Sequence, residues 1–212
     1  MAHLCIDDVD VSFGASTVLA GASLAIDRGE VVAVLGPSGS GKSTLLRVIA
    51  GITVPDAGAV TLGGVDITDV PTHERGVGMV FQDNQLFPHM SVGANVAFGL
   101  KMAGRPASSR RAAADEWLAR VGLDGFAARE VGALSGGEAK RVALARTLAV
   151  EPAVVLLDEP LTGLDRELHD RLAIDVATLL ADLAVTAVLV THDPDEAGTI
   201  AARSVQMEEI NG

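Results

Sequence analysis

Residues 36–44, which read GPSGSGKST, constrain the fold of this chain more than any other part of its sequence. They match the pattern G-x-x-x-x-G-K-[ST], whose glycines let the backbone curl so that successive N–H groups point at phosphate oxygens. Apolar residues 31–35 before the pattern predict a strand, and residues 42–50 after it predict a helix whose positive N-terminal end favours an anion. An ordinary Gly/Ser turn is the alternative, but a turn does not require that strand and helix. The sequence therefore predicts an α/β fold with a phosphate-binding loop.

The residue types within this loop indicate separate roles. The Lys42 ammonium is expected to reach the β- and γ-phosphates of a nucleotide, and the Ser43 hydroxyl to bind Mg²⁺. The loop residues expected to contact ATP are Gly36, Pro37, Ser38, Gly39, Ser40, Gly41, Lys42, Ser43 and Thr44.

Two adjacent carboxylates follow a second apolar stretch. Residues 153–157 read AVVLL and lead into Asp158, Glu159 and Pro160. Because ligands of open α/β sheets bind at the carboxyl ends of the strands, Asp158 is placed to hold Mg²⁺ through water. Glu159 is placed to polarise an attacking water as a general base. A polar strand exit without catalytic meaning explains the same residues, and only the phosphate loop elsewhere in the chain favours the catalytic interpretation.

Residues 134–138 read LSGGE and admit two compatible interpretations. Ser135 and Glu138 form the pattern of a capping box, in which each side chain satisfies a backbone N–H at the start of a helix. That pattern does not account for Gly136 and Gly137, since a glycine within a helix costs about 1 kcal/mol relative to alanine. Bare glycine backbone at a helix N-terminus favours an anion. We therefore expect a helix start that is capped and also meets a phosphate.

Composition excludes several classes of protein. Hydrophobic residues make up 49% of the chain, which excludes a disordered protein, yet the apolar runs have strand length and are too short to cross a bilayer. The net charge is −12 and no basic cluster is longer than Arg110-Arg111, so nucleic acid is not an expected partner. Cys5 is the only cysteine and residues 1–8 lack a secretory pattern, which together predict a cytosolic chain that can still bind a membrane protein.

The order of the predicted elements suggests one domain with a helical insert. Strands are expected at 4–11, 22–26, 30–35, 59–62, 77–81, 153–157 and 187–190, and helices at 42–50, 91–102, 108–120, 136–149, 166–180 and 195–202. This order predicts a mainly parallel α/β core, formed by 1–82 and 151–212, with an N-terminal antiparallel β subdomain. Residues 83–150 are alanine-rich and form the predicted helical subdomain of a single domain, 1–212.

The phosphate loop, residues 134–141 and the strand exit at 156–160, in this order and at these spacings, resemble the ATP-binding cassette of ABC transporters. The resemblance covers nearly the whole chain. It implies a P-loop NTPase fold with a RecA-like core, and hydrolysis of ATP with Mg²⁺. It also implies a homodimer, in which one copy contacts the ATP of the other through Ser135, Gly136, Gly137 and Glu138.

The resemblance assigns four further positions. Phe13 falls where the family stacks an aromatic ring on adenine, and Gln82 falls on the glutamine that senses Mg²⁺ and the γ-phosphate and faces the membrane subunit. Residues 161–165 fall on the loop that crosses the dimer interface. His192 falls on the histidine that contacts the γ-phosphate.

The residues taken by themselves leave simpler interpretations of these positions open. Without the resemblance, a core aromatic is the favoured interpretation of Phe13, and Asp165 is explained as the N-cap of the helix that follows. His192 precedes Asp193 and Pro194, which together are typical of a helix start on the surface.

The chain departs from the family pattern at a few positions. Glu138 and Ala139 stand where glutamines are common, and Phe13 replaces a commoner tyrosine. Thr162-Gly163 replaces Ser-Ala, which leaves the contacts of that loop open. Relatives usually continue beyond residue 209 for another strand and helix and often a regulatory domain, so we expect either a minimal subunit or a trimmed one.

The resemblance also implies partners. Transport needs a pore that this chain lacks, so integral membrane permease subunits must supply it. Residues 71–100 resemble importer cassettes of the sugar, sulfate, iron, polyamine and thiamine kind, which implies import, a solute-binding protein and a peripheral location on the cytoplasmic face of the membrane. Residues 82–102, with Leu86, Phe87 and Phe98, are expected to dock the permease. The alternatives are an exporter or lipoprotein-release cassette, a non-transport ABC ATPase, and a regulatory module without turnover.

Overall fold

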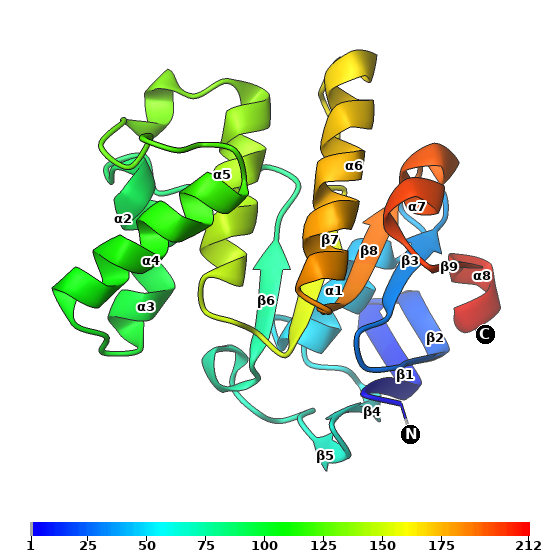
Figure 1. Cartoon of the computed structure of the whole chain (residues 1–212). Helices are drawn as coiled ribbons and strands as arrows, with labels where there is room; N and C mark the ends of the chain where they lie inside the picture. The colour runs from blue at the N-terminus through cyan, green and yellow to red at the C-terminus, as the bar shows by residue number, and fades with distance from the viewer. Residues whose placement is uncertain (1) are drawn as a thin grey trace. The chain divides into compact units, whose positions relative to one another are not determined.

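The computed structural model describes residues 2–212, which fall into two compact units (Figure 1). The first unit holds the chain up to residue 79 together with 153–159 and 176–212. The second holds 80–152 and 160–175. Two sheets dominate the first unit and helices dominate the second.

An antiparallel sheet opens the first unit. Leu4 of β1 pairs with Ile26 of β2 on one side and with Leu62 of β4 on the other. Along β1 the residues Leu4, Ile6, Val9 and Val11 are buried, as expected for a sheet with one face against the core. The strands, in the sheet order β2-β1-β4-β5, are β2 (Ser16–Ile26), β1 (Leu4–Phe13), β4 (Ala57–Leu62) and β5 (Val65–Asp66).

A five-stranded sheet forms the centre of the first unit. In β7 and β8 every residue is buried, which matches continuous apolar runs rather than an alternating pattern. Leu35 pairs in parallel with Thr191, and Asp158 with Val190, so the carboxyl ends of β3, β7 and β8 lie at one edge. The strands, in sheet order, are β6 (Val77–Val80), β7 (Val154–Asp158), β8 (Thr186–Thr191), β3 (Val31–Leu35) and β9 (Arg203–Gln206).

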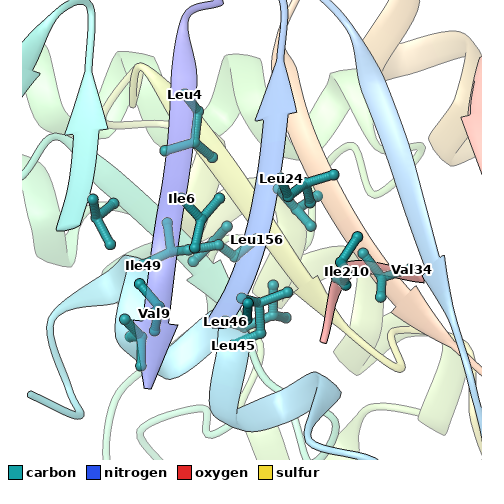
Figure 2. Close-up of a cluster of buried hydrophobic side chains, with 14 of the residues drawn as sticks. Leu4, Ile6, Val9, Leu24, Val34, Leu45, Leu46, Ile49, Leu156 and Ile210 are labelled. Atoms are coloured by element: carbon teal, nitrogen blue, oxygen red, sulfur yellow. The ribbon is translucent and has the colours of Figure 1, made fainter. Parts of the chain in front are cut away.

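The hydrophobic core of the first unit joins both sheets to α1. Figure 2 shows Leu45, Leu46 and Ile49 of α1 among side chains of the strands, including Leu156 of β7, and Ile210 near Val34. Burying side chains of this size contributes about 1.5–3 kcal/mol each, which fixes the helix that follows the phosphate loop. The helical segments of this unit are α1 (Lys42–Ala50), η1 (Thr72–Glu74), α7 (Pro194–Ile200) and α8 (Met207–Ile210).

The second unit is a group of helices. Its buried residues include Trp117 and Leu118 from α4 and Val142 and Leu144 from α5. No helix among residues 2–212 is both long enough and apolar enough to cross a membrane. The helical segments are α2 (Val92–Val96), α3 (Phe98–Met102), α4 (Ala107–Arg120), η2 (Val131–Ala133) and α5 (Gly136–Leu148), and α6 (Arg166–Asp182) continues from this unit into the first.

The strand β2 begins at Ser16 rather than at residue 22, β5 was not predicted, and three further elements also differ from the predicted ones. The single helix expected over 91–102 is two helices, α2 and α3, which meet at Ala97. The backbone angles of Ala97 stay near helical values, so the apolar pattern of the sequence continues across the break and does not reveal it. The strand β9 was not predicted, because only Val205 is apolar in RSVQ and the pairing with β3 creates the strand. The helix α8 is four residues long, too short to show a helical period.

Candidate functional site

The phosphate loop connects β3 to α1, and its own side chains hold it in shape. Lys42 is only 5% exposed, and its Nζ donates to the carbonyl oxygens of Gly36 at 2.7 Å and Pro37 at 2.8 Å. Gly41 has a φ of 100°, and a Cβ there would lie 3.0 Å from the carbonyl oxygen of Val18. Both the backbone angle and the space therefore require glycine at the residue before the helix.

The loop has unused hydrogen-bonding capacity. The Ser40 hydroxyl is buried and has no hydrogen-bond partner among residues 2–212. Across the same residues no side chain caps α1, and its first turn carries no acidic residue. Buried polar groups are normally satisfied, and the first N–H groups of a helix attract anions. The loop therefore fits a phosphate group, whose oxygens would accept from Ser40 and from the backbone.

A hydrogen bond joins the loop to the end of β7. The Ser43 hydroxyl donates to Asp158 Oδ1 at 2.8 Å, and Asp158 is buried. Burial raises the pKa of Asp158, while the Ser43 hydrogen bond and the nearby Arg47 and Lys42 partly offset that rise. A bound cation would favour the ionised carboxylate. Ser43 and Asp158 are thus a hydroxyl and a carboxylate that fit a small divalent cation.

Any cation at this position needs further ligands. Within residues 2–212 no group of three or more His, Cys, Asp or Glu side chains is arranged to hold a metal ion. Mg²⁺ usually keeps several waters and binds one or two carboxylates together with substrate phosphates. The two oxygens from Ser43 and Asp158 agree with that mode of binding.

Glu159 and His192 meet beside the same strand ends. His192 Nδ1 lies 3.4 Å from Glu159 Oε1, and the Glu159 backbone N–H donates to the Val190 carbonyl at 3.0 Å. Glu159 has a φ of 44°, a conformation that non-glycine residues rarely adopt and that is concentrated at functional sites. The structure therefore brings together the carboxylate and the imidazole that the sequence placed 33 positions apart.

The position of Phe13 excludes one of its two interpretations. Phe13 ends β1 and is 58% exposed, so it is not a core aromatic. An exposed ring can stack on a planar ligand. Its contact with adenine stays a prediction.

The residues expected to contact ATP from a second copy begin α5 in the second unit. The Glu138 backbone N–H donates to Ser135 Oγ at 3.3 Å, and the Ser135 N–H donates to Glu138 Oε2 at 2.7 Å, which confirms the capping box. A Cβ on Gly137 would lie 3.0 Å from Leu168 Cδ2, so packing favours glycine there. A Cβ on Gly136 would meet Leu164 at 3.7 Å, an ordinary contact. Packing therefore does not explain Gly136.

Gln82 also lies in the second unit, and α5 contacts the backbone next to it. The Gln82 carbonyl accepts from Lys140 Nζ at 3.5 Å. Asn84 and Gln85 have φ values of 61° and 45°, and their carbonyls accept from Arg146 at 2.8 and 2.7 Å. Burial lowers the pKa of Arg146. These cations stabilise a strained turn, and the sequence carried no signal for them, because Lys and Arg are ordinary in an alanine-rich helix.

The two local helix-start interpretations were also correct. Asp165 Oδ1 accepts from the Leu168 N–H at 3.0 Å at the beginning of α6. The Asp193 side chain caps α7, and Pro194 occupies its first turn. Neither contact decides whether Asp165 or His192 also acts on a ligand.

Comparisons with known proteins support one family. A family model described as "ABC transporter" matches residues 19–162. The chain is 50% identical over 206 residues to the Fe(3+) ions import ATP-binding protein FbpC of Streptomyces coelicolor, covering 97% of this chain and 59% of that protein. It is 44% identical over 211 residues to the sn-glycerol-3-phosphate import ATP-binding protein UgpC 2 of Agrobacterium fabrum, covering 100% of this chain and 57% of that protein.

A similar solved structure is also an ATP-binding cassette. It is described as the dimeric structure of a post-hydrolysis state of the ATP-binding cassette MJ0796 bound to ADP and Pi. The TM-score is 0.84 and the identity is 32%, and the match covers 96% of this chain and 93% of that one. The chain spans nearly all of this structure, but less than two thirds of the two curated import proteins.

Proposed function

The chain belongs to the ABC transporter family, and from this membership we propose that it binds and hydrolyses ATP to power import through separate membrane subunits. The observation that carries the proposal is the phosphate loop. It combines an unpartnered buried hydroxyl at Ser40, an uncapped helix start within the described chain and the buried ammonium of Lys42. These groups are what the triphosphate of ATP requires. Because Lys42 donates to two loop carbonyls, ATP binding exchanges those hydrogen bonds for phosphate oxygens.

Mg²⁺ is the proposed cofactor, with Ser43 and Asp158 of the first unit as protein ligands; a contact of Gln82 with Mg²⁺ stays a prediction from the family resemblance. When bound, Mg²⁺ neutralises charge on the β- and γ-phosphates. Asp158 then remains ionised despite its burial, while the Ser43 hydroxyl keeps the loop and the end of β7 together.

The proposed hydrolysis uses Glu159 and His192, which follow the carboxyl ends of β7 and β8. Glu159 accepts a proton from water as the water oxygen attacks the γ-phosphorus, and the bond to the bridging oxygen of ADP breaks. His192, next to Glu159, fixes the direction of the carboxylate and contacts the γ-phosphate. Phe13 stacks on the adenine.

We further propose that two copies share each ATP. Ser135, Gly136, Gly137 and Glu138 of one copy meet the phosphates held by the loop of the other. The N–H groups of the two glycines favour this arrangement, since the first N–H groups of a helix have no partner within the helix and the capping box engages only those of Ser135 and Glu138. The solved relative bound to ADP and Pi is described as dimeric, which supports the same arrangement here.

The proposed partners of the chain are inferred from the names of its curated relatives. The named curated relatives are import ATP-binding proteins, so we infer permease subunits, a solute-binding protein and a peripheral location on the cytoplasmic face of the membrane. Residues 82–102 are the proposed docking segment. Its Phe87 ring packs on Phe98 at 4.5 Å and both are half-buried, so less of the segment is exposed than the sequence indicated. His89 is exposed and is the better position for a crosslinking cysteine, because Asn84 is in a strained turn.

Release of phosphate from ATP tests this proposal. With Mg²⁺, the wild-type protein is expected to release phosphate, and Glu159→Gln is expected to bind ATP with almost no turnover. The absence of turnover in the wild type, with ATP still bound, would instead support a regulatory module.

A further inference from the structure

His192 occupies a very short connection whose neighbours are tied together by one buried hydroxyl. The connection runs from Thr191, the last residue of β8, to Pro194, the first residue of α7. Thr191 is 1% exposed, and its hydroxyl donates a short hydrogen bond to Glu196 Oε2. The same hydroxyl accepts from the Asp193 N–H at 3.1 Å. The Thr191 hydroxyl therefore ties the backbone that follows His192 to the side chain of Glu196.

Glu196 is the unusual member of this group. It is 3% exposed, although it lies in the first turn of α7, where an exposed carboxylate would interact with the helix dipole equally well. Burial of a carboxylate is costly unless strong hydrogen bonds compensate. The Asp193 side chain already caps the helix by accepting from the N–H groups of Asp195 and Glu196. The carboxylate of Glu196 is thus not needed as a cap, and it faces Thr191 instead.

The position of Thr191 connects this group to Glu159. The Glu159 N–H donates to the carbonyl of Val190, the residue before Thr191, and His192 follows directly with its Nδ1 3.4 Å from Glu159 Oε1. The positions of the Glu159 and His192 side chains therefore both depend on the carboxyl end of β8. We propose that Thr191 and Glu196 form a pair of positioning residues that hold the His192 imidazole beside the Glu159 carboxylate. The kinetic consequence rests on the proposed hydrolysis of ATP.

The first experiment compares Thr191→Val with Thr191→Ser in steady-state ATP hydrolysis. Valine keeps the shape of threonine and removes the hydroxyl, whereas serine keeps the hydroxyl. The valine variant is expected to lower kcat by about 10- to 100-fold, since misplacing a catalytic group by about 1 Å costs this much, with KM changed less than about 2-fold. The serine variant is expected to recover at least about half of the wild-type kcat. Equal kcat in Thr191→Val and the wild type would overturn the proposal.

Two further variants separate positioning from stability. Thr191→Val leaves Glu196 buried without its hydroxyl donor, which costs stability, whereas Thr191→Val with Glu196→Leu replaces both partners by apolar groups. The double variant is expected to recover the unfolding midpoint of the wild type and not its kcat. In a His192→Ala background, Thr191→Val is expected to cause no further loss of kcat, because the group that it positions is absent. A full additional loss in that background would contradict the proposal.

A measurement without ATP separates the failure of this proposal from the failure of the proposed function. The imidazole resonances of ¹⁵N-labelled protein are recorded, and His192 is assigned by its loss in His192→Ala. In the wild type, Glu159→Gln is expected to shift the His192 resonances, and in Thr191→Val the same substitution is expected to leave them in place. The same shift in both backgrounds would overturn the positioning role, whether or not the protein hydrolyses ATP.

Discussion

The helices α1 and α5 both begin at glycine-containing segments, but their N-termini are completed in different ways. In the first unit, α1 follows Gly41 in a left-handed conformation, and none of the described side chains caps it. In the second unit, α5 begins at Gly136 behind Ser135, which forms a complete capping box with Glu138. The first N–H groups of α1 therefore have no side-chain acceptor among the described residues and can take one from a ligand. At the start of α5, the capping box supplies side-chain acceptors from the chain itself.

This difference indicates a division of labour. A ligand that binds at α1 supplies acceptors that the chain lacks, so this helix start should determine the affinity for ATP. A ligand that meets α5 adds to an already stable helix, so this helix start should determine association with a second copy and contribute little to ATP affinity.

Lys42→Ala is expected to lower ATP affinity by at least about 100-fold, because charge-assisted hydrogen bonds to phosphate are worth about 1.5–3 kcal/mol each. Equilibrium binding of a fluorescent ATP analogue measures the change. Lys101→Ala, at an exposed lysine of α3, is the matched control and should bind like the wild type. Unchanged affinity in Lys42→Ala would show that the loop is not the nucleotide site.

Ser135→Ala is expected to lower the free energy of unfolding by about 0.5–2 kcal/mol through loss of the N-cap, with ATP affinity of the isolated chain unchanged. Chemical denaturation measures the first quantity and the fluorescent analogue the second. Ser91→Ala is a matched control, because Ser91 caps α2 in the same unit by accepting from the Ala94 N–H at 3.2 Å. Only Ser135→Ala should also weaken cooperativity in ATP hydrolysis. Equal kinetics in the two variants would limit Ser135 to its capping role.

Asp158 lies near the start of α1 and Glu138 near the start of α5, and their contributions to the free energy of unfolding should depend on pH in opposite directions. Burial raises the pKa of Asp158, so its contribution to stability is present below the unfolded pKa and is lost as pH rises through the folded pKa. Hydrogen bonds from Ser135 lower the pKa of Glu138, so its contribution is present above the unfolded pKa and is lost as pH falls through the folded pKa. Asp158→Asn should therefore raise the unfolding midpoint at pH 7, and Glu138→Gln should lower it.

Thermal unfolding between pH 7 and about pH 3, below the ordinary pKa of Asp and Glu, measures both differences. Each difference from the wild type should shrink as the pH falls. A shift of 1 kcal/mol corresponds to about 2–4 °C in a chain of this size. A lower midpoint for Asp158→Asn at pH 7 would show that Asp158 stabilises the free chain.

The sequence predicted those features of the fold and of the candidate site that local patterns encode. The family resemblance and the P-loop NTPase fold were confirmed by the family match and the solved relative. The helix at 42–50 was predicted to the residue, and the caps at Ser135 and Asp193 were correct, because glycines, capping residues and apolar runs act within a few positions.

The remaining features depend on contacts between distant segments. β9 is a strand because β3 lies beside it, and Arg146 reaches Asn84 across 62 positions. The Thr191–Glu196 pair was missed because a buried carboxylate looks like any other glutamate in a first helical turn. The predicted domain boundaries at 83 and 150 stay a prediction; in the structure, 160–175 belongs with the helical unit.

The oligomeric state of Glu159→Gln, with and without Gly136→Ala, tests the shared-site account most directly. Removing the general base leaves ATP bound, and light scattering after size-exclusion chromatography then reports association in ATP without Mg²⁺ and in ADP. In Gly136→Ala the added methyl group makes only an ordinary contact with Leu164, so the free energy of unfolding should be unchanged or higher by up to about 1 kcal/mol. The same methyl group covers the backbone that is proposed to meet the phosphate bound by the other copy. A site shared by two copies predicts a dimer of Glu159→Gln in ATP, monomers in ADP, and monomers of the double variant in both. Monomeric Glu159→Gln in saturating ATP, together with non-cooperative hydrolysis by the wild type, would contradict it.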